Sequence, residues 1–254
     1  MNLPEVKIED LLESGVHFGH NVRRWNPKME EYIFGVRNNV HIFDLRITVE
    51  AINSALIKLH ETVSKSGKVL FVGTKKQCSI VVKELAELNN YFYVNKRWLG
   101  GMLTNWKTIS KSINRLKDLE TFLSDPSSSN KVSKKELLDI SREKEKLNLN
   151  IGGIKNLNGK PDLVIIFDIV KDKIAVLESI KLEIPIIGIV DSNADPDLID
   201  YVIPGNDDAI RSINIFSNYF KQTILDAMET LNLNNNEAID IENEAIDIKP
   251  DEKI

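Results

Sequence analysis

Apolar residues follow two alternating patterns along this chain. Short, mostly apolar runs have the length and composition of parallel strands that are buried on both faces of a sheet. Between these runs, apolar residues recur every three or four positions, as on one face of a helix. Strands that alternate with helices predict right-handed βαβ units and a doubly wound, mainly parallel α/β sheet. The predicted strands are 40–45, 68–73, 91–94, 163–167, 186–190 and 201–203. The predicted helices are 4–13, a helix capped by Thr48 and ended by Gly67, 75–88, 173–181, and a last one from Asn206 to about Leu231.

Residues 105–150 interrupt this alternation. An apolar stripe on its first half predicts one helix, a Pro- and Ser-rich turn follows at 125–130, and Ser133 with Glu136 has the spacing of a capping box that opens a second, highly charged helix. We therefore expect a helical hairpin at 105–150, inserted into an α/β domain made of 1–104 and 151–231. Residues 232–254 are acidic, rich in Asn and without aromatic residues, so we expect a disordered tail.

Charge is distributed unevenly over the 254 residues. The net charge is −5, and residues 237–254 alone contribute −5, so the remainder is neutral. Residues 65–118 hold eleven Lys or Arg against three acids, a balance of +8. Because electrostatic attraction is local, this basic segment permits nucleic-acid binding despite the acidic total. The absence of a long apolar run argues against a membrane span, and the N-terminus lacks the apolar core of a secretory signal.

Enzyme motifs are missing from the loops where an α/β protein would carry them. There is no G-x-G-x-x-G, no P-loop and no G-x-S-x-G, and Gly73-Thr74-Lys75 is too short to cradle a diphosphate. The single cysteine, Cys78, lies on an apolar helical stripe and is expected in the core. A sugar-phosphate or nucleotide-binding enzyme on the same scaffold remains an alternative, and a protein-interaction module whose hairpin binds a partner helix is another.

Metal binding has two candidate positions. His17 and His20 are three residues apart, and six Asp lie between 191 and 208, after a predicted strand. The simpler interpretation is that the histidines form hydrogen bonds in a turn or donate to RNA phosphate, and that the carboxylates cap helices and turns. We therefore predict neither a metal site nor a cofactor.

Two segments combine cations with tryptophan. Residues 21–28 and 94–107 each contain Lys, Arg and Trp, and the second also contains the pair Gly100-Gly101. Lys and Arg neutralise phosphates, while Trp and Arg planes stack on exposed bases. The alternative is that Trp packs on the core and the cations are solvated, and composition alone leaves both interpretations open.

The same segments resemble a known family. Residues 15–20, 23–29 and 32–35, together with 71–77, 97–105 and 203–211, are similar to blocks of the bacterial form of small-subunit ribosomal protein two. The resemblance covers about residues 5–230 in order. Asn39 stands where the family pattern has Gly, although Asn also tolerates positive φ.

This resemblance implies a flavodoxin-like α/β fold with a coiled-coil hairpin. It also implies a ribonucleoprotein constituent of the cytoplasmic ribosome that binds small-subunit rRNA and neighbouring ribosomal proteins, helps to dock ribosomal protein one, and has no catalytic activity. The residues that we expect to contact RNA are Arg23, Arg24, Trp25, Lys28, Arg37, Lys75, Lys76, Lys96, Arg97, Trp98, Asn105, Trp106 and Lys107. We leave open which of the three tryptophans stack on bases and which pack inside the protein.

Overall fold

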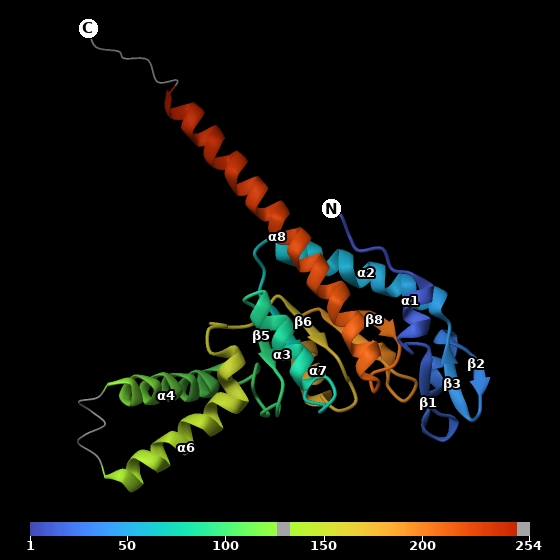
Figure 1. The fold of residues 1–254 in the computed structure, drawn as a ribbon, viewed down its shortest axis with the longest axis horizontal. Coiled ribbons are helices and arrows are strands. Elements are labelled where there is room, and N and C mark those ends of the chain that lie inside the picture. Colours follow the sequence, from blue (N-terminus) through green and yellow to red (C-terminus); the bar gives the residue numbers. More distant parts are fainter. Residues whose placement is uncertain (126–132, 248–254) are drawn as a thin grey trace.

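A parallel five-stranded sheet forms the centre of the protein (Figure 1). The computed structural model describes residues 1–125 and 133–247, with side chains described as far as Leu231. The strand order is β5-β4-β6-β7-β8, and every neighbouring pair is parallel. This confirms the predicted α/β class with a parallel sheet. The strands are β4 (Val69–Val72), β5 (Phe92–Val94), β6 (Leu163–Ile166), β7 (Ile186–Val190) and β8 (Tyr201–Pro204).

Helices cover both faces of this sheet. Alternate residues of β4 point to opposite sides, so that Val69 and Phe71 join one core and Leu70 and Val72 join the other. The first core is closed by α1, α2, α3 and α8, and the second by α7 and the start of α4. Burial on both faces explains why the central strands read as unbroken apolar runs. The helices are α1 (Ile8–Glu13), α2 (Leu45–Ser64), α3 (Ser79–Leu88), α4 (Trp106–Ser124), α7 (Lys173–Lys181) and α8 (Ile210–Asp247).

A helical hairpin projects from the sheet, as predicted (Figure 1). It consists of α4 and α6 (Lys134–Ile151), and Ser133 and Glu136 form both bonds of the expected capping box. Arg115 holds the two helices together through hydrogen bonds of 2.9 and 2.8 Å to the carboxylate of Glu143. The turn predicted at 125–130 falls largely outside the described residues, and coiled-coil geometry stays a prediction.

A second, antiparallel sheet lies beside the first, which the sequence did not predict. It has the order β1-β3-β2, with β1 (Phe18–Asn21), β2 (Ile33–Arg37) and β3 (Val40–Phe43). Only β3 was expected. The connection between β1 and β2 contains two short 3-10 helices, η1 (Val22–Arg24) and η2 (Pro27–Tyr32). Asn39 adopts a φ of +61° in the turn between β2 and β3, so it does take the left-handed conformation.

Several helix boundaries differ from the prediction: α1 begins at Ile8 rather than at residue 4, α3 at Ser79 rather than at residue 75, and α8 at Ile210 rather than near Asn206. Asp44, not Thr48, caps α2 by accepting from the backbone N–H of Arg46, while Thr48 is buried and donates its hydroxyl to the carbonyl of Pro204. The last helix continues past Leu231 to Asp247, into the segment that we expected to be disordered. No Gly or Pro interrupts the chain between Gly205 and Pro250, which removes the usual stop signals for a helix. Among the described helices, none combines the length and hydropathy that a bilayer span requires.

Candidate nucleic-acid interface

Acidic side chains from two strand ends surround one lysine at the carboxyl edge of the parallel sheet. The Nζ of Lys75, just after β4, lies 3.1 Å from Asp168 Oδ2, 2.7 Å from Asp207 Oδ1 and 2.7 Å from Asp208 Oδ1. Asp168 follows β6, and the other two carboxylates follow β8. The side chain of Lys75 is only 14% exposed. Its positive charge is therefore neutralised inside the protein.

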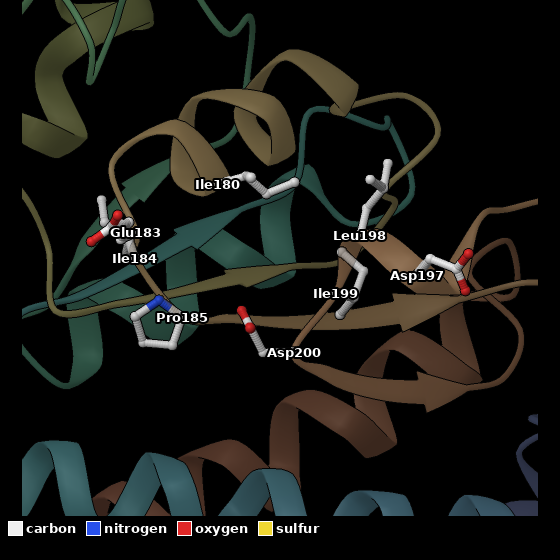
Figure 2. Close-up of a pocket in the computed structure, with 8 residues that line it drawn as sticks. All are labelled: Ile180, Glu183, Ile184, Pro185, Asp197, Leu198, Ile199 and Asp200. Atoms are coloured by element: carbon white, nitrogen blue, oxygen red, sulfur yellow. The ribbon is translucent and has the colours of Figure 1, made fainter.

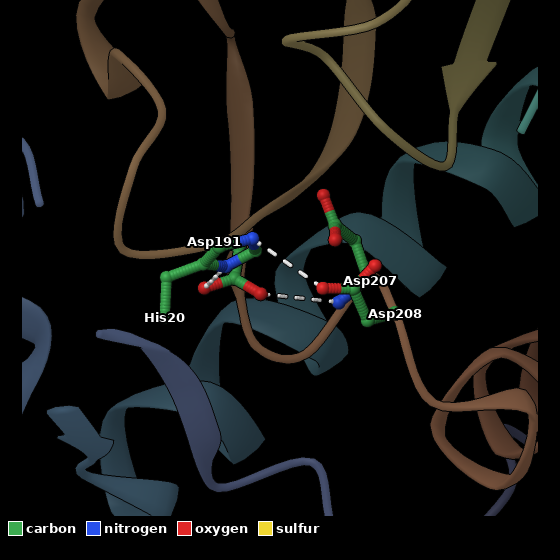
Figure 3. Close-up of side chains that lie close together, drawn as sticks. All are labelled: His20, Asp191, Asp207 and Asp208. Carbon is green, nitrogen blue, oxygen red and sulfur yellow. Dashed lines mark hydrogen bonds and ion pairs between the residues drawn. The ribbon is translucent and has the colours of Figure 1, made fainter. Parts of the chain in front are cut away.

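His20 joins the same group of side chains from β1 (Figure 3). Its Nδ1 lies 2.9 Å from Asp191 Oδ1 and its Nε2 lies 3.3 Å from Asp208 Oδ2, while its backbone N–H donates to the hydroxyl of Ser192 at 2.8 Å. The hydrogen bond to Asp191 raises the pKa of His20, against the opposing effect of burial. These contacts fasten the small sheet to the loop after β7. We call Lys75, His20, Asp168, Asp191, Asp207 and Asp208 the edge cluster.

Burial perturbs the titration of this cluster. Burial, with the nearby charges of Asp168 and Asp191, raises the pKa of Asp207 despite its contact with Lys75. Burial by itself lowers the pKa of Lys75, but the hydrogen bond to Asp207 and the surrounding carboxylates raise it overall. His20, Asp191, Asp207 and Asp208 bring potential ligand atoms within 4.8 Å of one another. The ammonium group of Lys75 already supplies a cation to two of these carboxylates.

His17 does not belong to this cluster, although it was paired with His20 as a candidate ligand. Its ring lies against Phe18, with centroids 3.9 Å apart, and its Nδ1 has no hydrogen-bond partner among the described residues. Burial lowers the pKa of His17. The two histidines therefore occupy different environments, and a site built on both is not supported.

Two of the predicted phosphate ligands are engaged by carboxylates. Lys75 lies within the edge cluster, and Lys28 forms ion pairs of 2.9 Å with Asp195 and 2.6 Å with Asp197. Because these charges are already compensated, phosphate would have to compete with carboxylate at both positions. We therefore no longer include Lys28 and Lys75 among the residues proposed to hold RNA.

Three other predicted ligands lie on the small antiparallel sheet or next to it. Arg23 and Arg24 are in η1, and Arg37 ends β2, and all three are exposed. The two η1 arginines, with Asn21, Val22 and Asn39, line a shallow hollow of about 460 Å³. Trp25 is half-buried, with its ring centroid 5.0 Å from that of His41. We call Arg23, Arg24 and Arg37 the sheet cations.

Four more of the predicted RNA ligands lie around the carboxyl ends of β4 and β5. Lys76 follows β4, Lys96 and Arg97 follow β5, and Lys107 is in the first turn of α4; all are exposed. Hydrogen bonds of 2.7 and 2.9 Å between Ser79 and Asn95 join the start of α3 to the loop after β5. We call Lys76, Lys96, Arg97 and Lys107 the loop cations. Within the described residues, none of the sheet or loop cations forms an ion pair.

The two tryptophans beside the loop cations, Trp98 and Trp106, lie in different environments. Trp98 is 6% exposed and its indole N–H donates to the carboxylate of Glu178 at 3.0 Å, so it packs inside the protein and we no longer propose it as an RNA-stacking residue. Trp106 is half-buried against the second core, and Asn105 beside it is exposed. Glu178 itself was missed, although it occupies a core-facing position of α7, near Ala175 and Leu182. An acid on an apolar stripe is the signal that could have revealed it.

One hollow lies at the opposite edge of the sheet (Figure 2). It has a volume of about 490 Å³ and lies beside the amino ends of β7 and β8. Ligands of open α/β sheets bind at the carboxyl ends instead. Its lining includes the carboxylates of Glu183, Asp197 and Asp200 and no cation, so it is unsuited to a sugar phosphate.

Comparison with known proteins agrees with the resemblance seen in the sequence. Residues 11–227 match the family model described as Ribosomal protein S2. The chain is 52% identical over 227 residues to the small ribosomal subunit protein uS2 of Rickettsia rickettsii (strain Sheila Smith), which covers 89% of this chain and 77% of that protein. It is 52% identical over 228 residues to the protein of the same name from Rickettsia akari (strain Hartford), covering 90% and 77%. This chain belongs to the ribosomal protein S2 family and is a structural constituent of the small subunit of the cytoplasmic ribosome.

Proposed function

We propose that this chain binds small-subunit rRNA through the sheet cations and the loop cations. The observation that carries the proposal is that these seven Lys and Arg are exposed and without a carboxylate partner in the described structure. Lys28, Lys75 and Arg46, by contrast, form ion pairs with carboxylates. Unpaired, exposed cations cost least to transfer onto phosphate, because no internal ion pair has to be broken.

Such contacts position the protein on RNA without reading bases. Lys and Arg reach phosphates, and the deep, narrow major groove of A-form RNA excludes side chains. Trp25 and Trp106 are each only half-buried at the border of a cation group, and the exposed residue Asn105 can face an RNA hydroxyl or base. We therefore expect recognition of RNA shape and backbone, supplemented by a few stacking contacts.

Salt-dependent binding to small-subunit rRNA tests this proposal. Replacing Arg23 and Arg24 together by Ala should weaken binding and reduce the slope of log affinity against log salt by about 0.7–0.9 for each phosphate that the protein no longer neutralises. Arg46→Ala is the matched control, because Arg46 is exposed but forms a bidentate pair with Asp44. If the double variant kept the slope of the unmodified protein, the sheet cations would not be RNA ligands.

We propose further that the chain has no catalytic activity. The family is one of structural ribosomal proteins. The positive charge of Lys75 in the edge cluster is compensated by carboxylates, and the hollow of Figure 2 lacks a cation. A thermal shift produced by a sugar phosphate or a nucleotide at low millimolar concentration would contradict this proposal.

Protein partners form the last part of the proposal. We expect neighbouring small-subunit proteins, including ribosomal protein one, to contact this chain, as the family resemblance implies. Val170, Ile174 and Leu177 are 48%, 52% and 49% exposed at and before α7, and apolar surface of this kind suits protein better than RNA. Ile174→Glu should then lower the amount of a neighbouring protein in purified subunits, measured by quantitative mass spectrometry. Unchanged stoichiometry of every small-subunit protein would exclude this face.

A further inference from the structure

The loop that carries two of the four loop cations, Lys96 and Arg97, is organised around a single carboxylate. Residues 95–105 connect β5 to α4 and contain almost no regular secondary structure. Within the loop, the backbone N–H of Met102 donates to Leu99 and that of Asn105 donates to Gly101, at 3.0 and 2.8 Å. Gly101 has a φ of +82°, which favours glycine. Other hydrogen-bond donors of the loop point towards α7.

Glu178 of α7 receives five hydrogen bonds from this loop. Its Oε1 accepts from the Trp98 indole N–H at 3.0 Å and from the Gly101 backbone N–H at 2.7 Å. Its Oε2 accepts from the backbone N–H groups of Leu103 and Thr104 at 2.9 and 3.0 Å, and from the Thr104 hydroxyl at 3.1 Å. Both oxygens are thus satisfied by residues 74 to 80 positions away in the sequence.

The carboxylate of Glu178 is charged without a cationic partner. The residue is 7% exposed, and no ion pair to it occurs among the described side chains. Burial by itself would raise the pKa of Glu178, but the hydrogen bonds from Thr104, Trp98, Leu103 and Gly101 outweigh it and lower the pKa. A buried anion satisfied by N–H groups is stable only while those groups converge on it. The anion and the loop conformation therefore depend on each other.

We propose that Glu178 is the positioning residue of three of the loop cations: its carboxylate holds residues 98–104 in the conformation that presents Lys96, Arg97 and Lys107 to rRNA. This inference rests on the proposed RNA-binding function. Arg97 directly precedes Trp98, and Lys107 follows Thr104 by three residues, so both are tethered next to atoms bonded to Glu178. A loop ordered before binding avoids the entropy cost of ordering its side chains on the RNA.

Glu178→Gln tests the role with almost no change in volume. The amide keeps one accepting oxygen but places an NH2 donor against the N–H groups that the carboxylate satisfied. We expect affinity for small-subunit rRNA to fall at least about tenfold, from the cost of ordering three side chains on binding. We also expect a smaller salt slope and a shift in Trp98 emission. Glu143→Gln, which breaks the exposed pair with Arg115 on the hairpin, is the matched control.

A double-mutant cycle separates positioning from general stability. If Glu178 acts through the loop, adding Glu178→Gln to the triple variant Lys96→Ala, Arg97→Ala, Lys107→Ala should cause no further loss of affinity. Additive losses, or a Glu178→Gln protein that folds and binds with the original affinity and slope, would overturn the inference. A triple variant that binds normally would instead contradict the proposed function of these cations.

A milder variant keeps the test decisive if Glu178→Gln fails to fold. Thr104→Val removes only the hydroxyl bond to Glu178 and retains the side-chain size and the backbone N–H. It should give an intermediate loss of affinity that also disappears in the triple background. Full affinity in Thr104→Val, with its Trp98 emission shifted, would show that the loop tolerates rearrangement and that Glu178 does not position the cations.

Discussion

Lys75 and Lys76 are adjacent in the sequence, yet the structure predicts opposite consequences of neutralising them. Lys75→Met removes the only ammonium group within ion-pair distance of Asp168 and Asp207 in the described structure and leaves their carboxylates 7% and 3% exposed. Lys76→Met removes an exposed charge that takes part in no described ion pair. Methionine preserves much of the lysine side-chain volume, so that charge is the main difference in both variants.

Removing one partner of a buried ion pair costs about 3–5 kcal/mol, because the other charge remains buried and uncompensated. Lys75 compensates two buried carboxylates and one half-exposed carboxylate, Asp208, which contributes less because solvent screens it. We therefore expect Lys75→Met to lower the free energy of unfolding by about 3–5 kcal/mol, or the melting temperature by about 10 °C for a chain of this size. Lys76→Met should change stability by less than about 0.5 kcal/mol.

The loss of stability caused by Lys75→Met should also depend on pH. Because the pKa of Asp207 is raised, the folded protein binds this proton more tightly than the unfolded chain. The contribution of Asp207 to stability is therefore present at low pH and is lost as the pH rises from the ordinary carboxyl range towards the folded pKa. Without Lys75 this pKa rises further. Lys75→Met should thus lose more stability at about pH 8 than at about pH 5.

Urea unfolding followed by circular dichroism measures these differences. The affinity of the same two variants for rRNA, measured at several salt concentrations, should show the opposite order. Lys76→Met should lose affinity, and a folded Lys75→Met should not. A Lys75→Met protein as stable as Lys76→Met would refute the electrostatic account of the edge cluster. A cost that did not change with pH would refute the assignment of a raised pKa to Asp207.

Two further predictions concern the packing of glycine and the titration of histidine. Gly153→Ala should destabilise the protein by about 1–3 kcal/mol, because the new Cβ would collide with the backbone oxygen of Tyr93. At Gly100 a new Cβ would contact no other atom, so Gly100→Ala should leave the melting temperature nearly unchanged. Equal melting temperatures for these two variants would contradict close packing at the base of the hairpin. His20→Gln should lower the free energy of unfolding more at about pH 6 than at about pH 8. Because the pKa of His20 is raised in the folded protein, its protonated ring stabilises the fold below about pH 6.5, and this stabilisation is lost as the pH rises through the folded pKa. Urea unfolding midpoints at the two pH values measure this difference. A larger loss of stability at the higher pH would contradict a raised pKa for His20.

The parallel sheet could be predicted because its signal is local. β4, β6 and β7 are buried on both faces, so nearly every residue in them is apolar and the runs are unmistakable. The hairpin was predictable for the same reason, from a helical stripe and a capping box within 105–150. The small sheet was missed because Phe18–Asn21 contains Gly, His and Asn, and its strand pairing with β3 has no periodic signature.

The sequence by itself determined the fold class, the helical hairpin and the composition of the cationic segments, since each depends on residues close together in the chain. Only the tertiary structure decided which of those residues face solvent. Lys75 is neutralised by Asp207, 132 positions away, while Lys76 remains exposed. Trp98 is buried on Glu178, 80 positions away, while Trp106 keeps part of its surface. Whether a cation or an aromatic ring is available to RNA depends on partners that distant segments supply, and local periodicity carries no information about them.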